Sequence, residues 1–241
     1  KTTYKNNLSE NKSLQVKNSL SSFKRDLTLP TYQFKGSQFA SFTEATFNMY
    51  NDQLDWVLGT NLITENFKEE PTTVLDRSYE HLTFGLFAQN NWNIEPNITL
   101  ETGLRTDYNT NYGMFVLPRV SLFYQYNESV SSRIGAGLGY KIPTIFTEDA
   151  EMRSYQNVLN IDPDNFNAET SIGFNADINY KTKIFNDAVS VSFNQLFFYT
   201  QLKNSLILEQ QGVDYLFKNS TRALNSYGFE ISEAENLIVN L

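Results

Sequence analysis

The stretch that decides the fold is LTFGLFAQNNWNI, residues 82–94, in which apolar and polar side chains alternate. Even-numbered positions are mostly apolar, whereas odd-numbered positions are mostly polar or small. Successive side chains of a β-strand point to opposite faces, so this stretch predicts an amphipathic strand. Residues 98–108, ITLETGLRTDY, repeat the pattern. Each run has about a dozen residues, roughly twice the length of a usual strand in a soluble domain.

Strands of this length suit a membrane, because a crossing strand needs about 9–11 tilted residues. Gly103, Arg105 and Asp107 share the polar face, as expected of a wall around a water-filled lumen. We therefore predict an all-β fold, an antiparallel transmembrane β-barrel meander, of which this chain supplies about ten strands. No apolar run is long enough for a transmembrane helix. The strands are expected at residues 12–24, 37–50, 54–66, 80–94, 98–109, 114–126, 130–142, 168–181, 188–200 and 222–232.

Short and long connections alternate along the predicted meander. Short turns are expected at residues 51–53, 95–97, 127–129 and 182–187. The opposite end carries residues 25–36, 67–79, 110–113, 143–167 and 201–221, of which only 110–113 is as short as a turn. Outer-membrane barrels have short periplasmic turns and long extracellular loops. The pattern therefore predicts that the long connections face outwards and carry ligand recognition.

Aromatic residues are expected at both ends of the apolar face. Trp56, Trp92, Tyr126 and Tyr180 fall at the short-turn end, and Tyr108, Tyr140 and Tyr199 at the long-loop end. Aromatic rings at both edges of an apolar band are typical of interfacial girdles. The alternative is that Tyr and Trp are present because they form strands well.

Composition excludes several functional classes. The net charge of −8 argues against a general nucleic-acid binder, and the lack of cysteine excludes disulfides and thiolate metal sites. His81 is the only histidine, which disfavours a transition-metal site or a histidine-based catalytic triad. Loop 143–167 is acidic but lacks the glycine and distal glutamate of a calcium loop. We expect no metal, no cofactor and no enzyme activity.

Candidate site residues are charged side chains on the polar faces of neighbouring strands. They are Glu101, Arg105, Asp107, Arg119, Arg133 and Lys141. One interpretation is that they line the lumen and meet a domain inside the barrel. The other is that they form cross-strand ion pairs, which neutralise charges that cannot face lipid. The sequence leaves both open.

Ordered motifs resemble a known family. They are FAQNNW (87–92), LETGLRTDY (100–108), LPRVS (117–121), RIGAGLGYKIPT (133–144), AETSIG (168–173), FFYT (197–200) and NSYGFE (225–230). In this order they resemble the barrel of TonB-dependent outer-membrane receptors, especially the Bacteroidetes type. The resemblance implies a barrel of about 22 strands in the bacterial outer membrane, plugged by its own domain. It also implies energy delivered through TonB, contact with outer-membrane lipid, and uptake of a small-molecule ligand such as a siderophore, haem, cobalamin or glycan.

The resemblance predicts that residues 1–241 are a single segment from the middle to late part of such a barrel. Plug domain, signal peptide and closing strand are expected to be absent from it, and residues 233–241 fit the family poorly. Two alternatives stay open. One is a passive porin or structural outer-membrane barrel, and the other is a soluble carbohydrate-binding β-sandwich.

Overall fold

One curved antiparallel sheet forms most of the molecule. The computed structural model describes residues 1–70, 76–184 and 189–237. Its eleven strands follow the order β1-β2-β3-β4-β5-β6-β7-β8-β9-β10-β13. Their bounds are β1 Thr2–Ser9, β2 Lys12–Leu29, β3 Tyr32–Met49, β4 Leu54–Glu69, β5 Tyr79–Glu95, β6 Ile98–Asn109, β7 Gly113–Gln125, β8 Val130–Lys141, β9 Glu169–Ile184, β10 Val189–Lys203 and β13 Leu224–Leu237.

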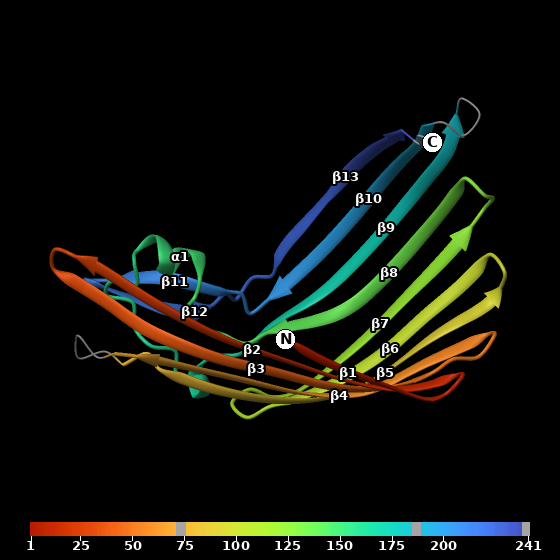
Figure 1. Ribbon diagram of the computed structural model, residues 1–241. Helices are drawn as coiled ribbons and strands as arrows, with labels where there is room; N and C mark the ends of the chain where they lie inside the picture. The colour runs from red at the N-terminus through yellow and green to blue at the C-terminus, as the bar shows by residue number, and fades with distance from the viewer. Residues whose placement is uncertain (71–75, 185–188, 238–241) are drawn as a thin grey trace.

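Smaller elements gather at one end of this sheet. They are the helix α1 (Glu148–Met152), the 3₁₀ turn η1 (Pro163–Asn165) and a hairpin of β11 (Leu206–Gln211) and β12 (Asp214–Asn219). Figure 1 shows the sheet bent into a trough, with α1 and the hairpin gathered at one end of it. Among the described residues, no helix is long and apolar enough to cross a membrane.

The strand register builds a mostly apolar outer face. Leu104 on β6 pairs with Ala88 on β5 and with Pro118 on β7, and Leu100 on β6 pairs with Trp92 and Leu122. Leu86 and Leu104 are 54% and 52% exposed, far more than core leucines. The predicted apolar face is therefore confirmed, and no other part of the described chain covers it.

The opposite face is concave. Phe34 on β3 and Phe67 on β4 lie under the segment that carries α1, which Figure 1 places at one end of the trough, on its concave side. Glu44 is ten residues beyond Phe34 on the same strand, so it shares this face, and it pairs with Asn61 on β4. Asn61 pairs with Gly85, which in turn pairs with Asp107. The polar rows therefore face the inside of the trough, as predicted.

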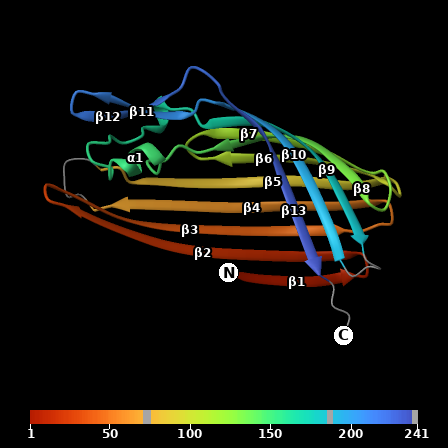
Figure 2. The same cartoon turned by 90° about the horizontal axis from the view of Figure 1, so that it is seen from above.

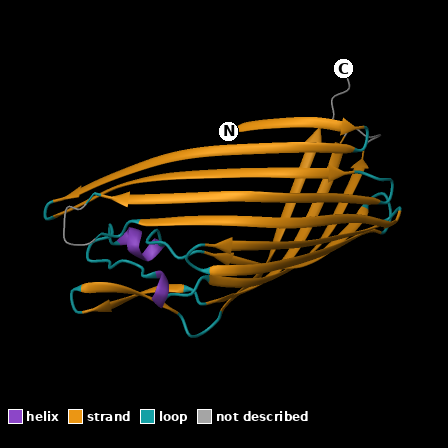
Figure 3. Ribbon diagram, turned by 90° about the horizontal axis from the view of Figure 1, so that it is seen from below, coloured by secondary structure: helices purple, strands orange, loops and turns teal. Residues whose placement is uncertain are grey.

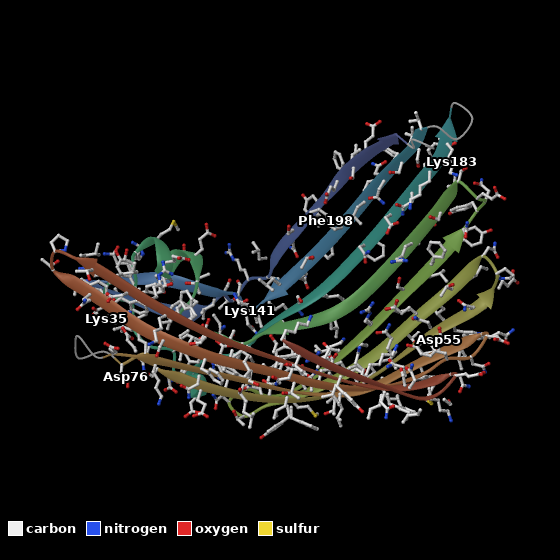
Figure 4. All side chains as sticks on the ribbon, in the orientation of Figure 1. Lys35, Asp55, Asp76, Lys141, Lys183 and Phe198 are labelled. Carbon is white, nitrogen blue, oxygen red and sulfur yellow. The ribbon has the colours of Figure 1, made fainter. Side chains whose placement is uncertain are left out.

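Connections separate by length between the two ends, which Figure 2 shows from above. The turns after β3, β5 and β7 lie at one end, together with Asp55 and Lys183 (Figure 4). Lys35 and Asp76 lie at the opposite end, near the long connections. Part of the predicted turn 182–187 lies outside the described residues, and β9 continues to Ile184.

The predicted long connection at residues 25–36 is wrong. β2 continues to Leu29 and β3 begins at Tyr32, so only Pro30 and Thr31 form the turn. The two strands stay paired at their long-loop ends because their side chains pack against the loops there. Phe34, for example, is fully buried beneath them. The β2–β3 hairpin therefore extends as a paired ribbon at the long-loop end, and we call its residues 25–36 the flap.

The expected meander of about ten strands is confirmed. The described sheet has eleven strands, and the long connection after β10 contains a separate two-stranded hairpin. β1 was missed because its sequence, TTYKNNLS, has little alternation and all its residues are exposed. In the described sheet β1 and β13 each have a neighbour on one side only, so both ends of the sheet present an open edge.

Candidate functional site

The long connections form one packed body at the end of the trough. Its fully or nearly buried core comprises Phe34, Phe67, Ile145, Ala150, Tyr155, Val158 and Phe217. Tyr155 stacks on Phe34 with ring centroids 4.5 Å apart, and Phe146 meets Phe67 edge to face at 5.0 Å. Figure 3 shows the short helical segments of this body beside the ends of the long strands. The loop 143–167 is therefore anchored by apolar burial, not only by its ends.

Arg77 holds this body to the sheet. Its side chain is 2% exposed and forms a buried ion pair with Glu69, whose side chain is 4% exposed. The guanidinium also donates to the backbone oxygens of Tyr155 (2.6 Å) and Val158 (3.1 Å) and to the Tyr32 hydroxyl (3.0 Å). Burial by itself lowers the pKa of Arg77, but the hydrogen bonds to Glu69 and Tyr32 outweigh it and leave the pKa above its ordinary value.

The loop segment beneath Arg77 has a strained backbone. Ser154, Tyr155 and Asn157 have φ values of 53°, 63° and 56°. Such left-handed conformations are costly for residues with a Cβ and persist only where surrounding contacts fix them. Arg77 and the stacked ring of Phe34 supply those contacts. We call Arg77 with its partners Glu69 and Tyr155 the clasp. The clasp and the strained turn at 154–157 therefore depend on the same contacts.

Further contacts join the flap and the β11–β12 hairpin to the same body. Arg25 on the flap pairs with Glu151 at 2.7 Å and donates to the Tyr155 hydroxyl at 3.1 Å. The Leu159 amide donates to the backbone oxygen of Tyr215 on β12 at 2.9 Å, and Arg153 lies over the Tyr215 ring. Loops distant in sequence thus present one outer surface.

A polar pocket opens beside this body. It has a volume of about 400 Å³ and is lined mainly by amides, hydroxyls and aromatic rings, among them Tyr112, Asn165, Asn167 and Asn204. Burial, aided by the charge of Asp162, raises the pKa of Tyr112 to about 12, so this phenol stays neutral at physiological pH. Asp162 also caps η1 by accepting from the Asp164 amide. In the described part of the chain no cluster of three or more metal-ligand side chains occurs.

On the concave face, Arg105 and Asp107 form the best-buried part of the predicted charged set. Arg105 Nε donates to both carboxylate oxygens of Asp107, at 2.8 and 2.9 Å, and Asp107 is 1% exposed. Gly85 makes room for this pair, because a Cβ there would collide with Asp107 Oδ1 and with Asn61 Oδ1. Both residues lie on β6, so this is an ion pair within one strand and not one of the cross-strand pairs of the second interpretation.

The other four candidates are arranged less tightly. Glu101 and Arg119 form an ion pair across adjacent strands. Arg133 stands over the Phe123 ring at 5.6 Å and is opposite Asp177 in the register, without an ion pair in the described residues. Lys141 is opposite Glu169 where β8 ends, and it too lacks an ion pair there. Arg133 and Lys141 are thus the cations of this set that remain available on the concave face.

Tyr140 corrects the predicted outer girdle. By strand alternation it belongs with Leu138 on the outer face, yet its hydroxyl donates to Asp107 Oδ2 at 2.8 Å and its ring stacks on Phe115 at 3.9 Å. β7 and β8 stop pairing beyond Arg119 and Gly137, so the ring can turn inwards between them. Tyr140 stays paired with Thr170 on β9, so the space for its ring comes from the missing β7 partner.

Sequence reasoning missed the clasp residues Glu69, Arg77 and Tyr155. Arg77 falls in the predicted connection 67–79, so no periodic pattern surrounds it. Its partners are eight residues earlier and about eighty residues later in the chain. Only a tertiary contact across that distance reveals it.

Taken together, the chain is the wall of a β-barrel with an apolar outside, a charged inside and folded loops at one end. Residues 1–236 match the family model described as TonB dependent receptor-like, beta-barrel, and the chain belongs to this family. It is a family of outer-membrane receptors and not of enzymes, in agreement with the expectation from sequence. No curated protein sequence matches the chain significantly.

Solved receptor structures share the fold. The siderophore receptor PirA from Acinetobacter baumannii superimposes with a TM-score of 0.67 at 15% identity, over 96% of this chain and 41% of that one. PirA from Pseudomonas aeruginosa gives 0.64 at 14% identity, over 95% and 48%. The Serratia marcescens hemophore receptor HasR, solved with its hemophore HasA and heme, gives 0.66 at 10% identity, over 95% and 47%. The chain therefore spans less than half the length of these receptors.

Proposed function

We propose that this chain is part of the barrel of a TonB-dependent receptor that imports a ligand across the bacterial outer membrane. The observation that carries the proposal is the trough itself: apolar rows outside, ion pairs that include the buried Asp107 inside, and one folded loop body at a single end. Its open edges at β1 and β13 and its partial coverage of the solved receptors support a longer parent barrel. The order of the motifs further supports the Bacteroidetes type.

The ligand would be recognised at the loop body and its neighbouring pocket. A siderophore, haem, cobalamin or glycan fits the general class, and two of the similar structures are named as siderophore receptors. Loops held by a rigid scaffold are suited to binding, and Arg77 makes this body rigid. The short turns at the other end would face the periplasm.

The concave charges would meet the receptor's own plug domain, and TonB would act on the N-terminal part of the receptor. Glu101, Arg105, Asp107 and Arg119 are already paired, so they would serve mainly to hold the wall. Arg133 and Lys141 have no ion pair in the described chain and are therefore the candidates for plug contact. We expect a carboxylate or backbone oxygen of the plug opposite them.

The test compares binding and uptake of the same labelled compounds by the native receptor, in strains with and without TonB. The probes are a ferric siderophore, haem, cobalamin and a neutral oligosaccharide. Arg133→Glu should reduce uptake at least tenfold while changing surface binding less than threefold. The control is Glu128→Lys, a charge reversal in the exposed short turn, which should change neither. Uptake that does not depend on TonB would support the passive porin and overturn the proposal.

A further inference from the structure

A gap interrupts the wall between β7 and β8. The two strands pair from Gln125 and Ser131 as far as Arg119 and Gly137, yet β7 begins at Gly113 and β8 continues to Lys141. The last pairing is next to Pro118, which has no N–H group to donate to a neighbouring strand. Figure 1 shows β8 curving away from β7 at this end. We call the unpaired region, 113–118 and 138–141, the β7–β8 seam.

The inner side of the seam is closed by two aromatic rings. Tyr140 turns inwards to Asp107 and stacks on Phe115 with an interplanar angle of 6°. On the outer side a groove of about 410 Å³ remains. This is within the range of volumes of small-molecule sites, which run from about 300 to 1,000 Å³. The groove opens towards the apolar outer face, since Val116, Leu138 and Ile172 line it and are 44–49% exposed.

The groove changes from apolar to cationic along its length. Met114, Val116, Leu138 and Ile172 form the apolar part, and Lys203 lies at the end towards the loops. The Lys203 side chain makes no hydrogen bond or ion pair within the described residues. Tyr108 pairs with Met114 and is 57% exposed, which places the groove at the level of the outer aromatic girdle. At that level a barrel meets lipid headgroups.

We propose that the β7–β8 seam binds one phosphate-bearing lipid of the outer leaflet, with an acyl chain along the apolar groove and its phosphate at Lys203. The groove is continuous with the lipid-facing rows, which favours an acyl chain as its occupant. The positive charge of Lys203 complements a phosphate, which places the headgroup at that end of the groove. The lipid covers a part of the wall where backbone groups lack strand partners and where bulk lipid chains alone would leave a void. The inference rests on the proposed placement of the chain in the outer membrane.

The test places a photoreactive benzophenone amino acid at Val116 of the native receptor and, as a matched control, at Leu86, an outer-face residue within a fully paired region. In intact outer membranes both positions should crosslink to lipid. After purification into detergent and addition of phosphatidylglycerol, Val116 should crosslink at near-stoichiometric lipid, and Leu86 should need at least a tenfold higher concentration. Failure of Leu86 to crosslink in membranes would contradict the membrane placement instead of the seam site.

Lys203→Gln tests the contribution of the phosphate headgroup separately from that of the acyl chain. It should raise the phosphatidylglycerol concentration for half-maximal crosslinking at Val116 about tenfold and leave crosslinking to diacylglycerol, which has no phosphate, unchanged. Inorganic phosphate alone should not compete, because the groove would hold the acyl chain. Leu138→Trp, which fills the groove, should reduce crosslinking to both lipids. Equal behaviour of Val116 and Leu86 in detergent, or an unchanged phosphatidylglycerol concentration in Lys203→Gln, would overturn the proposal.

Discussion

Replacement of Arg77 by alanine should release the loop body from the sheet without unfolding the sheet. The variant leaves the Glu69 carboxylate buried without its partner, and it removes donors from the backbone oxygens of Tyr155 and Val158. Breaking a buried ion pair by removing one partner typically costs about 3–5 kcal/mol. Because the clasp joins a local body to a large sheet, we expect this cost to appear as local opening.

Hydrogen exchange measured by mass spectrometry can detect that opening. The Leu159 amide, which donates to Tyr215 at 2.9 Å, should exchange at least about a hundredfold faster in Arg77→Ala, since each 1.4 kcal/mol corresponds to a factor of about ten. Amides of β5–β7 should exchange at the same rate as before. Arg77→Lys should be intermediate, because an ammonium keeps the charge but cannot reproduce the planar fork.

Two further variants make the reasoning refutable. Lys218→Ala removes an exposed ion pair with Glu209, whose side chain is 62% exposed, and should change exchange less than threefold. In the double variant Arg77→Met with Glu69→Leu, part of the protection should return, because no unpaired charge remains buried. If Arg77→Ala left Leu159 exchange within threefold of the original, or accelerated β5–β7 equally, the clasp would not be the local anchor inferred from the structure.

The remaining predictions concern packing, pH and edges. Gly85→Ala should lower the stability of the refolded receptor by about 1–3 kcal/mol, because its Cβ would collide with Asp107 and Asn61; Gly173→Ala, where nothing lies within 4 Å, should be nearly neutral in the same urea titration. Because the pKa of Tyr112 is raised, its contribution to the stability of the loop body is fully present below pH 10, the ordinary pKa, and is lost as the pH rises through about 12. Tyr112→Phe should reduce this pH-dependent loss of hydrogen-exchange protection in the loop body. The chain produced alone should associate through the open edges of β1 and β13 unless detergent is present, and a monodisperse monomer in plain buffer by light scattering would contradict this.

Much of the sheet follows from sequence because a period of two is a local property. Alternation at 82–94 and 98–108 fixes which side chains share a face, and pairing of consecutive strands needs no distant information. The outer placement of Leu86 and Leu104 and the inner placement of Arg105 and Asp107 were therefore predictable. So was the difference in connection length between the two ends, except where β2 and β3 continue through 25–36.

Only the tertiary structure shows where side chains lie when apolar and polar residues no longer alternate, or when a contact joins residues far apart in the sequence. Arg77 reaches the backbone of Tyr155 and Val158, and no local pattern encodes a contact across about eighty residues. Tyr140 leaves its expected face because the β7–β8 ladder ends at Gly137 and a hydrogen bond to Asp107 becomes available. The physical reason is that pairing of consecutive strands is local, whereas Arg77 lies outside the ladder and the Tyr140 ring has no β7 neighbour. The positions of both side chains therefore depend on distant groups that satisfy their polar atoms.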